Sequence, residues 1–230
     1  MRGLILSCAL AALVACAGDD RAARDPLRRS IGWFGIAGGE DLRAGCVPGA
    51  QARYRFVYNA VWEEQVRVYE VIASPGGEGA ALRATAIRGA PRLLNAYLLD
   101  HGGSHGDETR LEPAALRNLV AALDAAGFAG RPPDGTRLQS YDFYWLVSAC
   151  VDGRWHLNAW RREARGFGRL GFDELLFAAD RTGVPVNPPR PVDPAQRLLG
   201  YGEAPGERGR ARGSAFELVI REGRLGGLPW

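Results

Sequence analysis

Two histidines and several carboxylates stand close together in the segment DHGGSHGDE, residues 100–108. His101 and His105 are four positions apart, and Asp107 follows two residues later. Imidazole and carboxylate groups are common ligands of divalent metals, so this segment could hold an ion that activates water for hydrolysis. Four-residue spacing brings two ligands to one face only in a helix, and the three glycines favour a loop. We therefore favour a solvated loop over a metal site.

The common catalytic motifs are absent from the chain. It has no nucleophile elbow, no His-Glu-x-x-His, no P-loop and no dinucleotide-binding glycine pattern. It also has no lysine, so every basic side chain other than histidine is an arginine. We therefore predict no cofactor and favour a non-catalytic role.

Residues 1–15 have the pattern of an export signal. One arginine, Arg2, precedes an apolar run over residues 4–14. A membrane span needs about 20 apolar residues, so this run is too short to be one. A plain secretory signal is one interpretation of this pattern.

The four residues that end this run, Leu-Val-Ala-Cys at positions 13–16, resemble the lipobox of bacterial lipoproteins. The resemblance implies that residues 1–15 are removed and that Cys16 becomes an acylated N-terminus, palmitate being one of the acyl chains. Each buried CH₂ of such chains contributes ~0.8 kcal/mol to membrane binding. In this class Ala17, rather than an aspartate, after the cysteine implies sorting to the outer membrane, with the protein facing the periplasm.

Cys46 and Cys150 remain once Cys8 is cleaved off and Cys16 is acylated. An exported location favours disulfides, so we predict that these two form a bridge. A bridge that closes a loop of about 100 residues contributes ~4.7 kcal/mol in the chain-entropy model.

The charge pattern argues against a nucleic-acid partner. The formal net charge is +3, and the arginine-rich segment 203–224 also carries glutamates. A nucleic-acid reader would show a basic face with interleaved aromatic residues, which this chain lacks.

The segment 141–160 predicts a β-hairpin, because Asp152-Gly153 is a typical type I′ turn. The resulting register places Trp145 opposite Trp160, with His156 and Asn158 on the same face. The opposite face carries Cys150 and is more apolar, so we assign it to the core. The face of Trp145 would then be a candidate binding patch, unless a helix or the C-terminal tail covers it.

The same region resembles a pattern in uncharacterised bacterial exported proteins, in which Trp-x-x-Glu precedes a turn of the type Asp-Gly-x-Tyr-His. The positions that match are Phe128, Trp145, Asp152, Gly153 and His156. Trp155 replaces the tyrosine, Ser148 replaces the glutamate, and Ala129 stands where a second aromatic is expected. The resemblance covers residues 127–156 and implies a shared α+β core without an assigned activity.

The elements that would position these residues are predicted from periodicity and from turn residues. Alternating apolar residues predict strands at 53–59, 65–72, 81–87 and 215–220, the first two forming a hairpin. Apolar residues at helical spacing predict helices at 113–126 and 172–182, each followed by glycine. Residues 92–100 fit either a strand or a helix.

These elements predict an α+β fold, with an antiparallel sheet of hairpins packed against about two helices. The expected organisation is a signal peptide (1–15), a lipidated N-terminus and tether (16–52), an α+β domain (53–183) and a proline-rich C-terminal extension (184–230). In the tether, Trp33 and Phe34 would pack onto the domain, and the extension would contribute one further strand.

Three functions remain open. We favour an envelope lipoprotein that attaches to the membrane through Cys16 and whose domain binds or docks on another envelope protein. The alternatives are a metal-assisted hydrolase centred on His101 and His105, and a carrier of a small ligand or glycan. The carrier would need a concave pocket beside the 141–160 hairpin.

Overall fold

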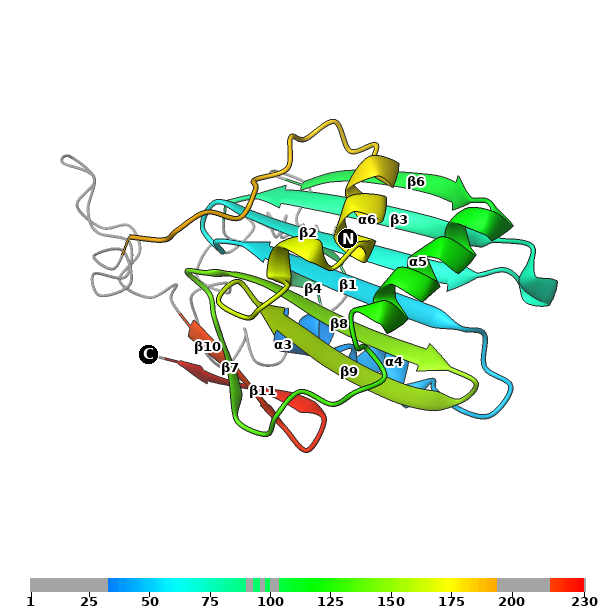
Figure 1. Ribbon diagram of the computed structural model, residues 1–230, viewed down its shortest axis with the longest axis horizontal. Coiled ribbons are helices and arrows are strands. Elements are labelled where there is room, and N and C mark those ends of the chain that lie inside the picture. Colours follow the sequence, from blue (N-terminus) through cyan, green and yellow to red (C-terminus); the bar gives the residue numbers. More distant parts are fainter. Residues whose placement is uncertain (1–32, 90–92, 96–97, 100–103, 194–215, 230) are drawn as a thin grey trace, which may run out of the picture.

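The computed structural model describes residues 33–89, 93–95, 98–99, 104–193 and 216–229. At its centre lies a six-stranded antiparallel sheet in the order β6-β3-β2-β1-β8-β9 (Figure 1). The strands of this large sheet are β1 (Arg53–Ala60), β2 (Gln65–Ala73), β3 (Ala80–Arg88), β6 (Ser104–Leu111), β8 (Phe143–Val151) and β9 (Arg154–Arg161). Two short strands, β4 (Leu93–Asn95) and β5 (Leu98–Leu99), pair with each other.

The predicted hairpins are present in the large sheet. β1 pairs with β2, and β8 pairs with β9 in the register computed from the sequence, with Trp145 opposite Trp160. Asp152 and Gly153 have φ values of 50° and 70°, as a type I′ turn requires. β1 also pairs with β8, which joins the two hairpins into one sheet.

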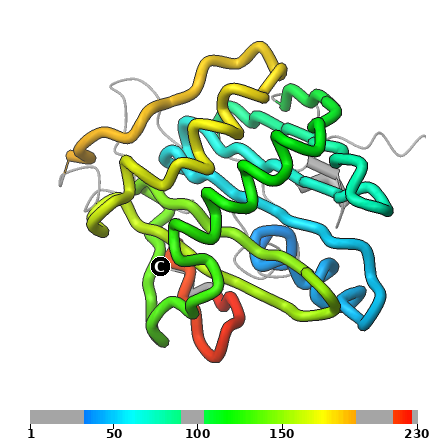
Figure 2. The backbone as a smooth tube through the Cα atoms, turned by 45° about the vertical axis from the view of Figure 1, so that its right-hand side comes forward, coloured from blue at the N-terminus to red at the C-terminus, as the bar shows by residue number. Residues whose placement is uncertain are grey.

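Two helices cover one face of the large sheet: α5 (Pro113–Ala125) and α6 (Phe172–Ala179) (Figure 2). Leu119 and Leu123 of α5 and Phe172 and Leu176 of α6 are buried in a single cluster with the side chains of that face. α6 ends before the predicted position because the backbone of Asp180 turns to an extended conformation.

The other face is covered by two helices and a second sheet. The helices are α3 (Trp33–Gly38) and α4 (Glu40–Ala44), and the sheet, in the order β11-β10-β7, consists of β7 (Thr136–Gln139), β10 (Phe216–Arg221) and β11 (Arg224–Pro229). Trp33 is fully buried beside Trp62, with ring centroids 4.9 Å apart, and Trp62 contacts Phe216 at 4.8 Å. Residues 33–44, which the sequence analysis places in a tether, are therefore packed helix.

The fold is thus α+β, with four α-helices among the described residues rather than about two. The segment 92–100 contributes β4 and β5, and the predicted strand at 215–220 is β10. Three strands, β6, β7 and β11, were not predicted. No helix in the described ranges is long and apolar enough to cross a membrane.

The predicted disulfide is present. Cys46 and Cys150 are bonded, with their Cα atoms 5.5 Å apart. The bond ties the segment after α4 to the end of β8, so it fixes the N-terminal helices to the hairpin.

A proline-rich strap, residues 180–193, follows α6 and crosses the ends of β1 and β2. Arg67, fully buried on β2, pairs with Asp180 and donates to the carbonyl oxygen of Val184. Tyr58 donates to the carbonyl oxygen of Asn187 at 2.9 Å, and Gln65 donates to that of Pro185. These polar contacts hold in place a segment whose prolines exclude helix.

Candidate functional site

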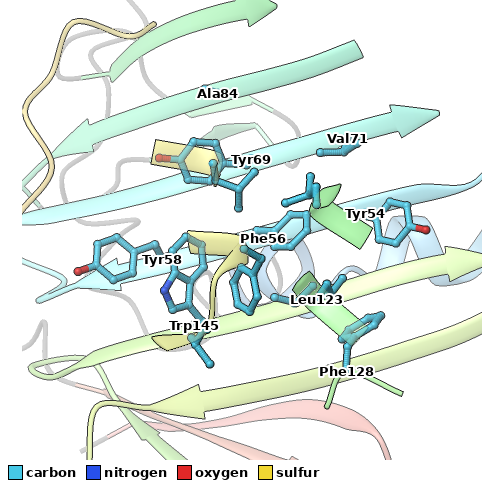
Figure 3. Packing of buried hydrophobic residues seen from close by; sticks show 14 of the residues in the cluster. Tyr54, Phe56, Tyr58, Tyr69, Val71, Ala84, Leu123, Phe128 and Trp145 are labelled. Atoms are coloured by element: carbon cyan, nitrogen blue, oxygen red, sulfur yellow. The ribbon is translucent and has the colours of Figure 1, made fainter. Parts of the chain in front are cut away.

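The predicted Trp145 patch is not a surface. Trp145 is 1% exposed and lies among Tyr58, Phe56 and Tyr69 on the face that α5 and α6 cover (Figure 3). Trp160 is half-buried against Phe172, with ring centroids 5.2 Å apart. The expectation that this face binds a partner is therefore wrong, because the helices close over it.

The polar residues of that face hold the loop that follows α5. Asn158 donates to the carbonyl oxygens of Gly127 and Gly130, both at 3.0 Å, and the indole of Trp160 donates to that of Ala126. His156 packs beside the ring of Phe128 at 5.8 Å. These contacts give the polar groups a structural role inside the domain.

The face that carries Cys150 is buried as well, as predicted. Tyr144 and Leu146 of β8 and Leu157 of β9 pack against Trp33 and Leu138. Both faces of β8 are buried because the N-terminal helices and the small sheet cover the side that α5 and α6 leave open.

Two of the three candidate metal ligands, His105 and Asp107, lie on β6 at the edge of the large sheet. His105 is exposed on β6, opposite Ala86 of β3, so it belongs to a strand and not to the predicted loop. Asp107 accepts a hydrogen bond from the hydroxyl of Thr109 at 2.9 Å. His101 and Cys16, the predicted lipidation site, lie outside the described residues. Within the described part of the chain, no group of three or more potential ligands is arranged to hold a metal.

A polar cleft opens beside the β8–β9 hairpin, where β7 of the small sheet meets the start of β8 and the end of β9. Its volume is about 240 Å³. Nine residues line it: Arg137, Leu138, Gln139, Tyr141, Asp142, Phe143, Tyr144, Arg161 and Glu163. A small-ligand carrier would need a concave site at this hairpin.

The turn at residues 140–142 forms one side of the cleft and is fixed by buried Asn59. The Asn59 amide donates to the carbonyl oxygens of Ser140 at 2.9 Å and of Asp142 at 2.6 Å. The Asp142 carboxylate in turn accepts two hydrogen bonds from Arg162, at 2.6 and 3.0 Å. This pairing joins the start of β8 to the residue after β9.

On the small sheet, a buried carboxylate orders the lining residues of β7. Glu217 of β10 is 2% exposed and accepts hydrogen bonds from Arg137 and from the side-chain amide of Gln139. Glu217 lies opposite Gln139 in the strand register. Two β7 side chains are therefore held at the cleft by one acid beneath them.

Positive and negative charges are balanced around the cleft. Two arginines and two carboxylates line it. Their ion-pair partners, Glu217 and Arg162, add one further acid and one further arginine. Arg137 pairs with Glu217, Asp142 pairs with Arg162, and Glu163 lies 3.8 Å from Arg162. Arg161 is exposed and forms no ion pair with any described residue, so its guanidinium donors face solvent.

Two hydrogen-bonding atoms of the lining residues have no partner. They are the hydroxyl oxygen of Tyr144 and the Oε1 atom of Gln139, and both are buried. Burial raises the pKa of Tyr144, so its hydroxyl stays protonated and can donate. Buried polar groups normally have partners, and these two are among eight buried side-chain atoms of the described residues that have none.

The cleft therefore offers hydrogen-bond donors, acceptors and aromatic surface to a small polar ligand. Three lining residues, Arg137, Leu138 and Gln139, belong to β7, a strand that the sequence pattern does not predict. The sequence carries two signals of the small sheet. Asp134-Gly135 is a turn pair before the segment 136–139 that forms β7, and Glu222-Gly223 is a turn pair between β10 and β11. Glu222 has a φ of 50° and Gly223 of 68°, so this pair makes the same kind of turn as Asp152-Gly153.

Comparison with protein-family models, with curated proteins and with solved structures finds no significant match.

Proposed function

We propose that this chain is a bacterial envelope lipoprotein, anchored through acylated Cys16, whose domain is a non-catalytic binding module with its ligand site in the polar cleft. Periplasm-facing attachment to the outer membrane follows from Ala17 after the cysteine. The cleft is the observation that carries the binding role.

The anchor proposal rests on the leader and on the cysteine pair. An apolar run that ends in Leu-Val-Ala-Cys at positions 13–16 supports lipidation at Cys16. The Cys46–Cys150 bond agrees with an oxidising compartment such as the periplasm.

The binding proposal rests on the composition of the cleft. Its lining combines planar polar side chains with aromatic residues, and two buried side chains order it: Asn59 bonds the turn at residues 140–142, and Glu217 bonds Arg137 and Gln139 of β7. Specific small-molecule sites combine a preformed cavity with a few well-placed polar groups. A protein partner at the Trp145 face is no longer part of the proposal, because that residue is buried.

The anchor is tested by metabolic labelling with an alkyne-tagged palmitate in a bacterial host. Wild type should be labelled and should fractionate with the membrane. The Cys16→Ser variant should lose the label and retain its leader, whereas the Cys8→Ser control should be labelled like wild type. Equal labelling of wild type and Cys16→Ser would contradict lipidation at Cys16.

The binding role is tested by thermal-shift screening of the full chain, purified in detergent micelles, against a library of small polar metabolites. A ligand that binds the folded state raises the unfolding temperature. An Arg161→Gln variant should weaken binding of any hit, whereas Arg169→Gln, which lies outside the cleft lining, should not. If the Arg161→Gln substitution does not change the binding of the ligands found, the site lies elsewhere. If no ligand is found, the proposal of a small-ligand binding module is contradicted.

A further inference from the structure

We propose that the cleft binds a neutral ligand rich in hydroxyl groups, such as one sugar unit of a glycan. This inference rests on the proposed binding function and specifies the chemical class of the ligand. Three observations support it: the unpaired hydrogen-bonding atoms, the balanced charge and the size of the cleft.

The unpaired atoms require both a donor and an acceptor from the ligand. Oε1 of Gln139 only accepts, whereas the protonated hydroxyl of Tyr144 has a proton to donate. A ligand hydroxyl can donate to the first and accept from the second. A carboxylate or a phosphate only accepts, so it would leave Oε1 of Gln139 unpaired, and an ammonium only donates, so it would leave the phenol proton of Tyr144 without an acceptor.

Both atoms are covered by protein, so the ligand must displace a side chain to reach them. Gln139 is the residue that would move, at the cost of its hydrogen bond to Glu217, because it is half-buried, whereas the ring of Tyr144 is 1% exposed and packed in the core. Binding should therefore change the environment of the Gln139 side-chain amide.

The balanced charge disfavours an ionic ligand. An anion drawn to Arg161 would also meet Asp142 and Glu163, and a cation drawn to those acids would meet Arg137 and Arg161. For either kind of ion, repulsion by the like charges of the cleft cancels most of the attraction to the opposite charges. A neutral ligand instead accepts hydrogen bonds from the guanidinium of Arg161 and lies against the half-buried ring of Tyr141.

The volume of about 240 Å³ limits the ligand to a small unit. Pockets for drug-sized molecules occupy roughly 300–1,000 Å³. One sugar ring is the expected occupant, and the rest of a longer glycan would extend into solvent.

The test compares sugars of the same ring configuration that carry neutral, acidic or basic substituents. Methyl glycosides of glucose, galactose, mannose and N-acetylglucosamine are titrated against the full chain in micelles, alongside the uronic acid and amino sugar of matching configuration. Saturation-transfer NMR, which observes the ligand, measures each affinity. At least one neutral glycoside should bind at least about tenfold more tightly than both of its charged counterparts.

Variants then locate the site. Tyr144→Phe and Arg161→Gln should each weaken binding of that glycoside about tenfold, the range expected when one hydrogen bond is lost. Tyr54→Phe is the matched control, because Tyr54 is buried on the opposite face of the sheet and does not line the cleft. Tyr144→Phe removes only an unpaired hydroxyl, so the variant should fold.

The outcomes separate the ligand class from the binding function. Tighter binding of a charged sugar that still depends on Arg161 would overturn the ligand class and leave the cleft as a binding site. Sugar binding that is equal in Tyr144→Phe, Arg161→Gln and Tyr54→Phe would overturn the site. Absence of sugar binding, with a non-sugar hit at Arg161 in the screen, would overturn this inference alone.

Discussion

The ring of Tyr58 stacks on the indole of Trp145, with centroids 4.8 Å apart and planes inclined by 28°. The two residues lie directly opposite each other where β1 pairs with β8. Phe177 of α6 contacts both rings, at 5.3 and 5.6 Å. This aromatic cluster joins the two hairpins to α6 and occupies the middle of the larger core.

Trp145→Ala should therefore destabilise the domain by about 3–5 kcal/mol, the usual cost of truncating a large buried aromatic side chain. Urea unfolding followed by circular dichroism measures the loss. Val47→Ala is the control, because Val47 is 56% exposed and should change stability by less than about 0.5 kcal/mol. A loss below about 1 kcal/mol for Trp145→Ala would contradict its placement in the core.

Gly39 lies where the N-terminal helices meet the hairpin, with a φ of 66°. A Cβ atom there would come within 2.4 Å of the Ser148 hydroxyl and 2.8 Å of the Trp155 ring. Gly39→Ala should destabilise the domain by about 1–3 kcal/mol through backbone strain, with the steric overlap adding to that cost. Chemical denaturation measures this change.

Gly35→Ala is the matched control for Gly39. It lies inside α3, and a Cβ there meets nothing within 4 Å. Alanine favours helix over glycine, so this variant should gain up to about 1 kcal/mol. Equal effects of the two substitutions would show that α3 and α4 do not pack on the hairpin as described.

The buried pair of Arg67 and Asp180 locks the proline-rich strap to β2. The two side chains are 0% and 6% exposed. Asp180→Asn should cost about 3–5 kcal/mol, because it leaves the Arg67 charge buried without its partner. The double variant Arg67→Met/Asp180→Asn should recover part of that loss. A double-mutant cycle in urea measures the coupling, and purely additive losses would count against a direct pair.

Asp41 on α4 makes the stability of the domain dependent on pH. Burial alone would raise the pKa of Asp41, but hydrogen bonds to Arg55 at 2.6 and 2.8 Å and the charge of Arg55 hold it below the ordinary value. Because the pKa of Asp41 is lower in the folded state, its ionised carboxylate stabilises the fold. This stabilisation is complete above the unfolded-state pKa of about 3.9 and is lost as pH falls through the folded-state pKa.

Asp41→Asn should therefore lose less stability than wild type as pH falls below about 4. Thermal unfolding measured from pH 7 to pH 2 compares the two proteins. Asp180 also has a lowered pKa but is present in both, so the difference between the curves isolates Asp41. Parallel curves would contradict the Arg55 contact.

The disulfide should contribute about 2–5 kcal/mol, because Cys46 and Cys150 are 104 positions apart and their bond restricts the unfolded chain. Reduction of wild type should lower the unfolding temperature to that of Cys46→Ala/Cys150→Ala. The double variant should be insensitive to reductant. Unchanged stability of wild type on reduction would mean that the bridge does not form.

The sequence by itself determined the local elements whose periodicity and turns are strong. Alternation fixed the register of the β8–β9 hairpin once Asp152-Gly153 was recognised as its turn, and helical spacing located α5. The disulfide was expected because the pattern of residues 1–15 predicts export and because Cys46 and Cys150 are the two cysteines outside the predicted signal and its acylation site. Each of these inferences depends on residues close in sequence or on a single possible pairing.

The tertiary structure alone decided which faces are covered and where the cleft lies. Trp145 and Tyr144 point to opposite faces of β8, and both are buried because segments far apart in sequence, residues 33–44 and 216–229, close the second face. The cleft likewise gathers residues from β7, β8 and the end of β9, with Glu217 of β10 beneath them. Burial depends on which distant segments pack together, and the periodicity of one segment carries no information about its covering partner.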